Sequence, residues 1–204
     1  MMEWIDTKIL RYLNYDNGFF IEVGANDGVI QSNTYVLEKD YNWNGILIEP
    51  SLTSFYNCKK LRTNSKCYNC ALVSEDYKEE YIRGDFNGHL MSSVDGNRLH
   101  SDVRIKVKAR TLTSILDEND VTKIDFFSLD VEGYELEVLK GLDFSKYQPV
   151  YILVEIYEKD KVEIMEYLSV NNYELICNLS GFNLDNNPLW DGTHNDYLFE
   201  NKNN

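Results

Sequence analysis

Residues 19–28 decide the fold, and they read Phe19-Phe20-Ile21-Glu22-Val23-Gly24-Ala25-Asn26-Asp27-Gly28. The apolar first half predicts a short buried strand, and the glycines predict a turn directly after it. A second apolar run, residues 45–50, predicts another strand that ends on Glu49. This arrangement is typical of nucleotide-type sites, because backbone N–H groups at the turn approach the ligand and the second acid accepts ribose hydroxyls.

The spacing of the glycines narrows the class of ligand. The pattern Glu22-x-Gly24-x-x-x-Gly28 lacks the middle glycine that lets a diphosphate approach the backbone. It therefore favours a ligand with a ribose and an adenine but no phosphate, such as S-adenosylmethionine. The same absence disfavours a nicotinamide oxidoreductase.

Two further segments complete a family pattern. Residues 111–116 read Thr-Leu-Thr-Ser-Ile-Leu, and residues 124–135 form an apolar run that ends in Asp130-Val131-Glu132-Gly133-Tyr134-Glu135. With the 24–28 turn, Ser32-Asn33-Thr34 and Ile48-Glu49-Pro50, this order resembles the FkbM-type methyltransferases over about residues 18–156. The resemblance implies an S-adenosylmethionine-dependent O-methyltransferase on a Rossmann-like sheet, whose usual acceptor is a hydroxyl of a sugar or a polyketide.

Length and composition fit one soluble domain, residues 1–204. The chain is 43% hydrophobic and 13% aromatic, which excludes disorder and allows a sizeable core. It has no run of 18 apolar residues and its first residues are acidic, so we expect neither a membrane span nor a signal peptide. The four cysteines are too few and too irregular for a disulfide scaffold, and Cys67-x-x-Cys70 has no second pair, so we expect a reducing, cytoplasmic location.

The net charge of −14 disfavours a nucleic-acid substrate, since phosphate contacts need basic surfaces. The longest basic cluster, residues 104–110, alternates lysine or arginine with apolar residues. That alternation predicts a solvated edge strand protected by lysine.

Alternating strand and helix patterns define the fold class. We predict an α/β fold, a Rossmann-like class I methyltransferase with a mostly parallel seven-stranded sheet, helices on both faces and an insertion after strand three. The insertion, residues 75–110, is expected to bind the acceptor; long irregular segments inside a compact domain are usually either functional or disordered. The expected strands are residues 19–23, 45–49, 66–73, 124–129, 150–156, 172–179 and 195–200. The expected helices are residues 2–14, 33–40 (capped by Ser32 or Asn33), 52–62, 112–118, 132–140 and 160–170.

In open α/β sheets the ligand lies beyond the carboxyl ends of the strands, so the cofactor residues are expected there. Glu49 is assigned to the ribose hydroxyls, and Glu22 and Gly24 to the methionine end. Ser32 and Asn33 can donate to the cofactor carboxylate at a helix N-terminus, or they can simply cap that helix. The full predicted set is Glu22, Gly24, Ala25, Asn26, Asp27, Ser32, Asn33, Glu49, Pro50, Ala71 beside the adenine, and Asp130.

Methyl transfer to a hydroxyl needs a base or a metal, because an alcohol is a poor nucleophile until it loses its proton. Asp130 and Glu155 end two predicted strands, and His89 lies in the insertion, so these three are the catalytic candidates. The two acids can equally bind Mg²⁺ or Mn²⁺. A metal-free reaction is favoured, because no third oxygen ligand is evident near them in the sequence; a structural role is favoured for Glu135, and Glu132 is left open.

The resemblance, together with the absence of basic or strongly apolar acceptor features, implies a sugar hydroxyl within a glycan as the acceptor. Tyr134, Tyr157 and Trp190 suit stacking against sugar faces, although core or rim packing is the more common role for each one singly. Two alternatives stay open: a polyketide or phenolic acceptor, favoured by an apolar pocket from residues 84–100, and a non-catalytic binding module on the same fold.

Overall fold

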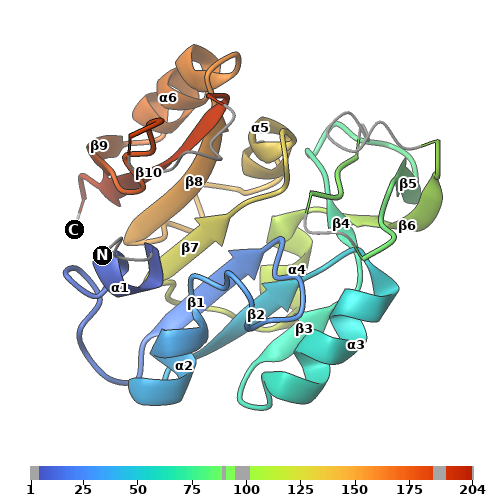
Figure 1. Ribbon diagram of the computed structural model, residues 1–204, viewed down its shortest axis with the longest axis horizontal. Coiled ribbons are helices and arrows are strands. Elements are labelled where there is room, and N and C mark those ends of the chain that lie inside the picture. Colours follow the sequence, from blue (N-terminus) through green and yellow to red (C-terminus); the bar gives the residue numbers. More distant parts are fainter. Residues whose placement is uncertain (1–4, 89–90, 95–101, 186–191, 204) are drawn as a thin grey trace.

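The computed structural model describes residues 5–88, 91–94, 102–185 and 192–203 (Figure 1). A seven-stranded sheet runs through the molecule in the order β3-β2-β1-β7-β8-β10-β9. Neighbours from β3 to β8 are parallel, and β10 is antiparallel to both β8 and β9, which confirms the predicted mostly parallel sheet. Its strands are β1 (Phe19–Val23), β2 (Asn44–Ile48), β3 (Lys66–Tyr68), β7 (Phe126–Leu129), β8 (Tyr151–Tyr157), β9 (Tyr173–Asn178) and β10 (His194–Asn201).

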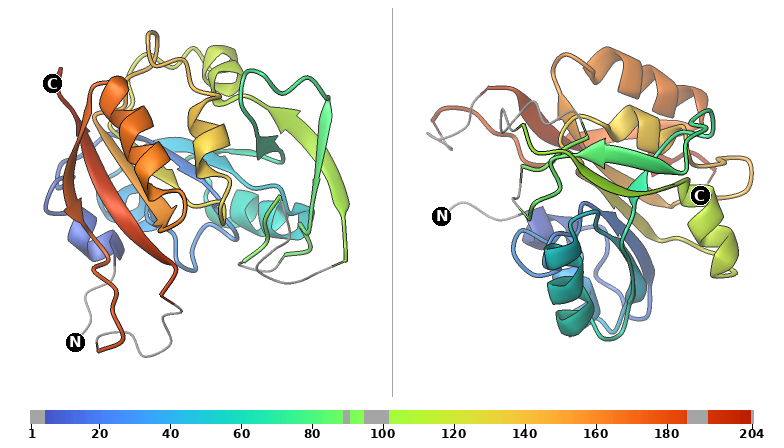
Figure 2. Two further views of the ribbon diagram at one scale, coloured as in Figure 1. Left: turned by 90° about the horizontal axis from the view of Figure 1, so that it is seen from above. Right: turned by 90° about the vertical axis from the view of Figure 1, so that its right-hand side faces the viewer.

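Helices cover both faces of this sheet because successive side chains of a strand point to opposite sides. Phe20 of β1 packs with apolar side chains of α1, α2 and α3, whereas Ile21 packs with those of α4, α5 and α6. In the right-hand view of Figure 2, α3 lies below the sheet and α6 above it. The helices are α1 (Ile5–Ile9), α2 (Tyr35–Asp40), α3 (Leu52–Leu61), α4 (Leu112–Glu118), α5 (Glu135–Leu139) and α6 (Lys161–Val170).

The first helix is shorter than the predicted 2–14. It ends at Ile9, and the chain continues in tighter turns, in which Arg11 and Tyr12 donate to carbonyls three residues back. The turns still bury Leu13, which packs in the same cluster as Ile9. The apolar spacing therefore marked a buried face correctly but did not require a continuous helix.

The predicted strand 66–73 is split between two sheets. Residues 66–68 form β3 of the main sheet, and β4 (Ala71–Leu72) instead joins a three-stranded sheet in the order β4-β6-β5, with β5 (Tyr81–Gly84) and β6 (Ile105–Arg110). The side chain of Asn69 sits at the break and donates to the carbonyls of Glu49 and Pro50, both at 2.9 Å.

The basic segment 104–110 is not an edge strand as predicted, since β6 lies between β4 and β5. Val107 is buried with Ile82, Phe86 and Ala71, so packing on one side explains the alternating pattern. Figure 1 shows this small sheet beside the ends of the central strands.

The strand order reverses between β1 and β7, because β2 and β3 continue on one side of β1 and β7 and β8 on the other. Such a reversal opens a crevice at the carboxyl ends of the strands, where α/β proteins bind ligands. Within the described residues, no helix has the length and apolar character needed to cross a membrane.

Candidate functional site

The turn after β1 brings two strands together at the crevice. Gly24 has φ +83°, in the left-handed region that favours glycine, and a Cβ here would collide with the backbone carbonyl of Asp130. The backbone N–H groups of Gly24 and Ala25 both donate to the carbonyl of Ile48, at 3.0 and 3.2 Å. The glycine is therefore required by the close approach of the β1 and β7 ends.

Glu49 directly follows β2, and two backbone donors hold its carboxylate. The N–H of Asn26 donates to Oε2 at 2.9 Å, and that of Ser51 donates to Oε1 at 2.7 Å. Burial raises the pKa of Glu49 to about 7, although both N–H donors act to lower it. Each carboxylate oxygen keeps a second lone pair, and the residue lines the adjoining cavity, so hydroxyl donors of a ligand fit here.

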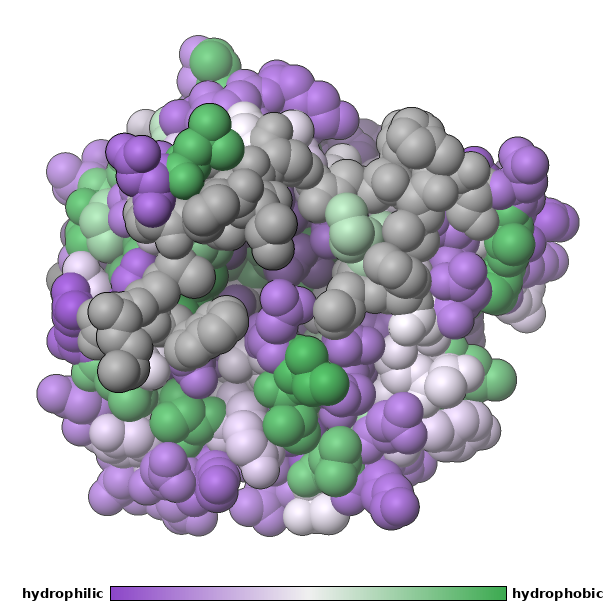
Figure 3. Space-filling model, viewed as in Figure 1, coloured by the Kyte–Doolittle hydropathy of each residue, from purple (hydrophilic) through white to green (hydrophobic). Residues whose placement is uncertain are grey.

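A cavity of about 940 Å³ lies beyond these strand ends. Figure 3 shows a hollow near the middle of this face, with both hydrophilic and hydrophobic side chains inside it. Most of the predicted cofactor and catalytic residues line the cavity: Gly24, Ala25, Asn26, Ser32, Asn33, Glu49, Pro50, Ala71, Asp130 and Glu155. This volume is at the upper end of the range for small-molecule sites.

Glu22 and Asp27 are not part of the cavity wall, contrary to prediction. Glu22 is buried below it and accepts hydrogen bonds from Ser32 Oγ at 2.8 Å, Asn33 N at 2.8 Å and Thr34 Oγ1 at 2.6 Å. Asp27 Oδ1 accepts the backbone N–H groups of residues 29 and 30 and so closes a local turn. Both acids shape the loop of residues 24–34 from within.

The roles of Ser32 and Asn33 follow from that loop. Ser32 Oγ accepts the N–H of Tyr35, the first residue of α2, so it does assist the helix start, although Thr34 occupies the cap position. The side chain of Asn33 donates to Ser128 Oγ of β7 at 3.0 Å. These contacts tie the loop to the sheet while both residues remain in the cavity wall.

Arg62 completes this support, although no pattern in the sequence indicates it. It follows α3, is 1% exposed, and lies in an ion-pair network with Glu38 (2.9 Å) and Glu22 (3.5 Å). Its guanidinium also donates to the carbonyl of Gly28 at 2.8 Å and to Thr34 Oγ1 at 2.9 Å. One buried arginine thus ties the middle of the loop of residues 24–34 to its end.

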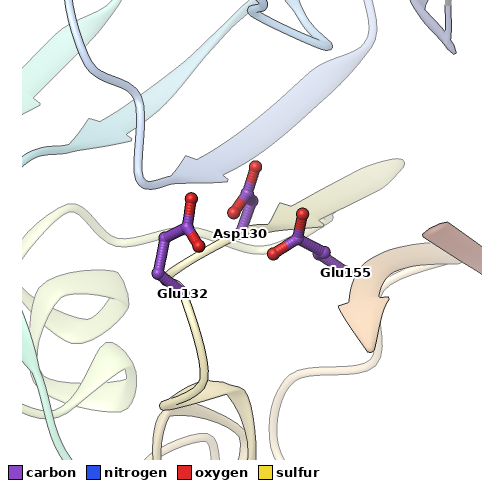
Figure 4. A group of neighbouring side chains, drawn as sticks. All are labelled: Asp130, Glu132 and Glu155. Atoms are coloured by element: carbon purple, nitrogen blue, oxygen red, sulfur yellow. The ribbon is translucent and has the colours of Figure 1, made fainter. Parts of the chain in front are cut away.

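Three carboxylates converge at the other end of the cavity (Figure 4). Asp130 follows β7, Glu155 lies in β8, and Glu132 precedes α5; one oxygen from each lies within 4.8 Å of the others. Burial raises the pKa of Asp130 well above its ordinary value, and Glu132 raises it further. Burial likewise raises the pKa of Glu155, and Asp130 raises it further, whereas the close side chain of Glu155 acts to lower the pKa of Asp130. Glu132 places a third carboxylate beside these two, which was not evident in the sequence.

Two more cavity residues were missed as site candidates. His194, at the start of β10, places Nε2 3.4 Å from Glu155 Oε1. Asp196, two residues further along β10, pairs with Glu155 in the strand register, and burial raises its pKa to about 6. Only the position of His194 before the last strand hinted at this placement.

The remaining predicted residues have mixed outcomes. His89 and Trp190 lie outside the described residues, as does His100. Tyr134 lines the cavity, whereas the hydroxyl of Tyr157 donates to Glu132 Oε2 at 2.6 Å. Glu135 accepts the N–H groups of Val131 and Gly133 at 3.1 and 3.0 Å, which fits the structural role expected of it.

Comparisons with known proteins give one family and one fold. The methyltransferase FkbM domain family matches residues 22–175. A solved methyltransferase FkbM from Methylobacillus flagellatus KT is similar at 17% identity and a TM-score of 0.60; the match covers 96% of this chain and 48% of that chain, so the present chain spans about half of that relative. No curated protein matches.

Two other similar structures contain the cofactor or its product. Aeropyrum pernix fibrillarin, solved with natively bound S-adenosyl-L-methionine, has a TM-score of 0.51 and 12% identity, over 91% of this chain and 67% of that one. M. capricolum TrmK, solved with S-adenosyl-homocysteine, has a TM-score of 0.53 and 9% identity, over 99% of this chain and 70% of that one. At these identities the likeness extends to the fold alone, a class I methyltransferase fold.

Proposed function

The chain belongs to the FkbM methyltransferase family, and from this premise we propose that it transfers a methyl group from S-adenosylmethionine to a sugar hydroxyl, within a glycan. One observation carries the cofactor assignment: Glu49 stands at the end of β2, held by two backbone N–H groups, in the wall of the cavity. A carboxylate there can accept both hydroxyls of a ribose.

The residues around Glu49 fit the rest of the cofactor. Gly24 lines the cavity at the end of β1, and Ala71 leaves room for a flat base at the edge of β4. Ser32 and Asn33 line the part of the cavity assigned to the methionine carboxylate. Glu22 acts beneath them as a positioning residue, since its oxygens are taken by the loop that it holds.

The acid cluster marks the reacting end of the site. When bound, S-adenosylmethionine supplies a methyl group on a sulfonium, which passes to the acceptor oxygen as the carbon–sulfur bond breaks. The hydroxyl proton must leave in the same step, and Asp130 and Glu155 are two of the carboxylates in this region. Each can accept the proton, or together they can bind a cation that makes the hydroxyl more acidic. His194 beside Glu155 is the remaining candidate base among the described residues.

The acceptor side of the cavity includes part of the 75–110 insertion. Phe86 and Val94 contribute apolar surface, and Ser92 and Ser93 contribute hydroxyls. A mixed surface of this kind suits a sugar, which has apolar ring faces and polar edges, and the net charge of −14 suits a neutral acceptor. The apolar share of the wall also supports a second candidate, a phenolic or polyketide hydroxyl.

Calorimetry tests the cofactor, and a methyl-transfer panel tests the acceptor. S-adenosylhomocysteine should bind the protein and raise its melting temperature by mass action, and NAD⁺ should not. Radiolabelled methyl transfer is then measured onto deoxysugar glycosides, phenols and a macrolide aglycone in parallel. Binding of NAD⁺ without binding of S-adenosylhomocysteine would overturn the proposal, and transfer only to phenols would move the acceptor to the second candidate.

A further inference from the structure

The carboxylates of Asp130, Glu132 and Glu155 lie close together, and Glu155 is buried while the other two are partly exposed. Their nearest oxygens lie within 4.8 Å of one another, and Figure 4 shows all three groups directed toward a common space. Like charges this close repel, and burial removes the water that would screen them. The other charges that raise the pKa of Asp130 and Glu155 are again carboxylates, those of Asp196 and Glu135. The arrangement is costly unless a cation or protons balance it.

Glu155 gives the second, independent observation. It is 8% exposed and lines the cavity, yet its Oε2 atom is fully buried without a hydrogen-bond partner. A buried carboxylate oxygen without a partner costs free energy comparable to a lost hydrogen bond to a charged group. The other oxygen, Oε1, faces His194 Nε2 at 3.4 Å, so the histidine holds one side of the carboxylate and Oε2 is left without a donor.

The backbone places Glu132 where a ligand is needed. Glu132 has φ +60°, which is uncommon for a residue with a side chain, and the Tyr157 hydroxyl donates to its Oε2 at 2.6 Å. The left-handed turn brings this side chain back toward the end of β7, and the tyrosine fixes one of its oxygens. A hydrogen bond of this kind to a ligating carboxylate is common around metal ions.

We propose that Asp130, Glu132 and Glu155 bind one divalent, oxygen-preferring cation, Mg²⁺ or Mn²⁺, at the acceptor end of the cavity. Three carboxylate oxygens occupy half of an octahedral shell and leave positions for water and for hydroxyls of the acceptor. The inference rests on the proposed function, and it makes Asp130 and Glu155 metal ligands rather than the base that removes the hydroxyl proton. It also favours acceptors with two neighbouring hydroxyls, which can occupy two of the open positions at once.

Direct metal binding tests the proposal without any turnover. The purified chain is stripped with EDTA, and free Mn²⁺ is followed by electron paramagnetic resonance during titration. We expect one strong Mn²⁺ site per chain, weakened at least about tenfold in Glu132→Gln and in Glu155→Gln. Glu166→Gln is the matched control: it removes an exposed acid from α6 and should bind Mn²⁺ like the wild type. Weak binding to surface acids is expected to be equal in all four proteins.

Competition with other cations tests the metal site, and binding of S-adenosylhomocysteine tests the proposed function separately. Mg²⁺ should displace the bound Mn²⁺, and methylammonium should not; displacement by methylammonium would mean that the acids hold an organic cation instead. Identical Mn²⁺ isotherms for wild type and Glu155→Gln would also overturn the metal site and leave the acids sharing protons. Binding of S-adenosylhomocysteine, measured on the same preparations, shows separately whether the proposed function stands. Thermal unfolding confirms that each variant is folded.

Discussion

Replacing Arg62 by methionine should destabilise the protein strongly, although Arg62 contacts nothing that reacts. Methionine keeps the apolar stem of the side chain but removes the guanidinium from Glu22 and Glu38, which are 4% and 8% exposed. Breaking a buried ion pair by removing one partner costs about 3–5 kcal/mol. Glu22 keeps its bonds from Ser32, Asn33 and Thr34, and Ser65 Oγ still donates to Glu38, so the lower half of that range applies.

The expected loss is therefore about 3–4 kcal/mol in the free energy of unfolding, a large fraction of the stability of an ordinary domain. For a chain of this length it corresponds to a fall of roughly 6–16 °C in melting temperature. Urea denaturation followed by circular dichroism and by tryptophan fluorescence measures the free energy. Arg83→Ala, an exposed arginine on β5, should change it by at most about 0.5 kcal/mol.

A variant without charges in this network shows whether the loss of stability comes from the unpaired carboxylates of Glu22 and Glu38. The triple variant Glu22→Gln, Glu38→Gln, Arg62→Met carries no uncompensated charge and should recover much of the lost stability. The single variant should also bind S-adenosylhomocysteine more weakly, because the loop of residues 24–34 loses its anchor at Gly28. A single variant within about 1 kcal/mol of the wild type, or a triple variant no more stable than the single one, refutes the reasoning.

Four further outcomes are expected. Glu49→Ala should weaken binding of S-adenosylhomocysteine by roughly 1.5–3 kcal/mol, since a charged hydrogen-bond acceptor is lost; an unchanged affinity in calorimetry would mean that the ribose is held elsewhere. Because hydroxyl donors favour the ionised form of Glu49, whose pKa is about 7, affinity should rise with pH up to about 7 and then level off, and this rise should be missing in Glu49→Gln. Gly24→Ala should lower stability by more than the roughly 1–2 kcal/mol cost of the left-handed backbone, since a Cβ also collides with the Asp130 carbonyl; Gly181→Ala, with φ +57° and nothing within 4 Å, should show the backbone cost alone in the same denaturation assay. With a net charge of −14, RNA binding should be undetectable at physiological salt by fluorescence anisotropy, and tight salt-dependent binding would redirect the proposal to a nucleic-acid acceptor.

The strand ends could be predicted because their signals are local. An apolar run, a glycine and an acid within ten residues marked the end of β1, and the same logic located Glu49 and Asp130. Arg62 could not be predicted in this way. An arginine after a helix is usually exposed, and its burial depends on Glu22 and Glu38, which are 40 and 24 residues away in the chain.

The ends of the insertion and the acid cluster were also hard to predict, because they too depend on contacts that are not local in the sequence. The run 66–73 is apolar enough for one strand, and only the pairing of Ala71 with Ala109 shows that its second half belongs to another sheet. Glu132 was ambiguous because acids before a helix also stabilise the helix dipole. Its nearness to Glu155 depends on a left-handed backbone turn that the sequence does not mark, since such residues are most often glycine or asparagine.

The pairing of β4 with β6 bears on how the proposed acceptor-binding segment of such a protein can change during evolution. Ala71 lies opposite Ala109 and Leu72 opposite Arg110. The insertion therefore starts and ends at neighbouring positions, close to the strands that carry the cofactor residues. Lengthening a flexible segment between fixed neighbours costs little, about 0.6 kcal/mol for each doubling of its length. Evolution can therefore exchange the segment between β4 and β6 while the strand ends of β1 and β2, which carry Gly24 and Glu49, stay constant. Chimaeras joined at Leu72 and Ala109 offer the same route in the laboratory, with one cofactor half carrying the acceptor segments of different relatives.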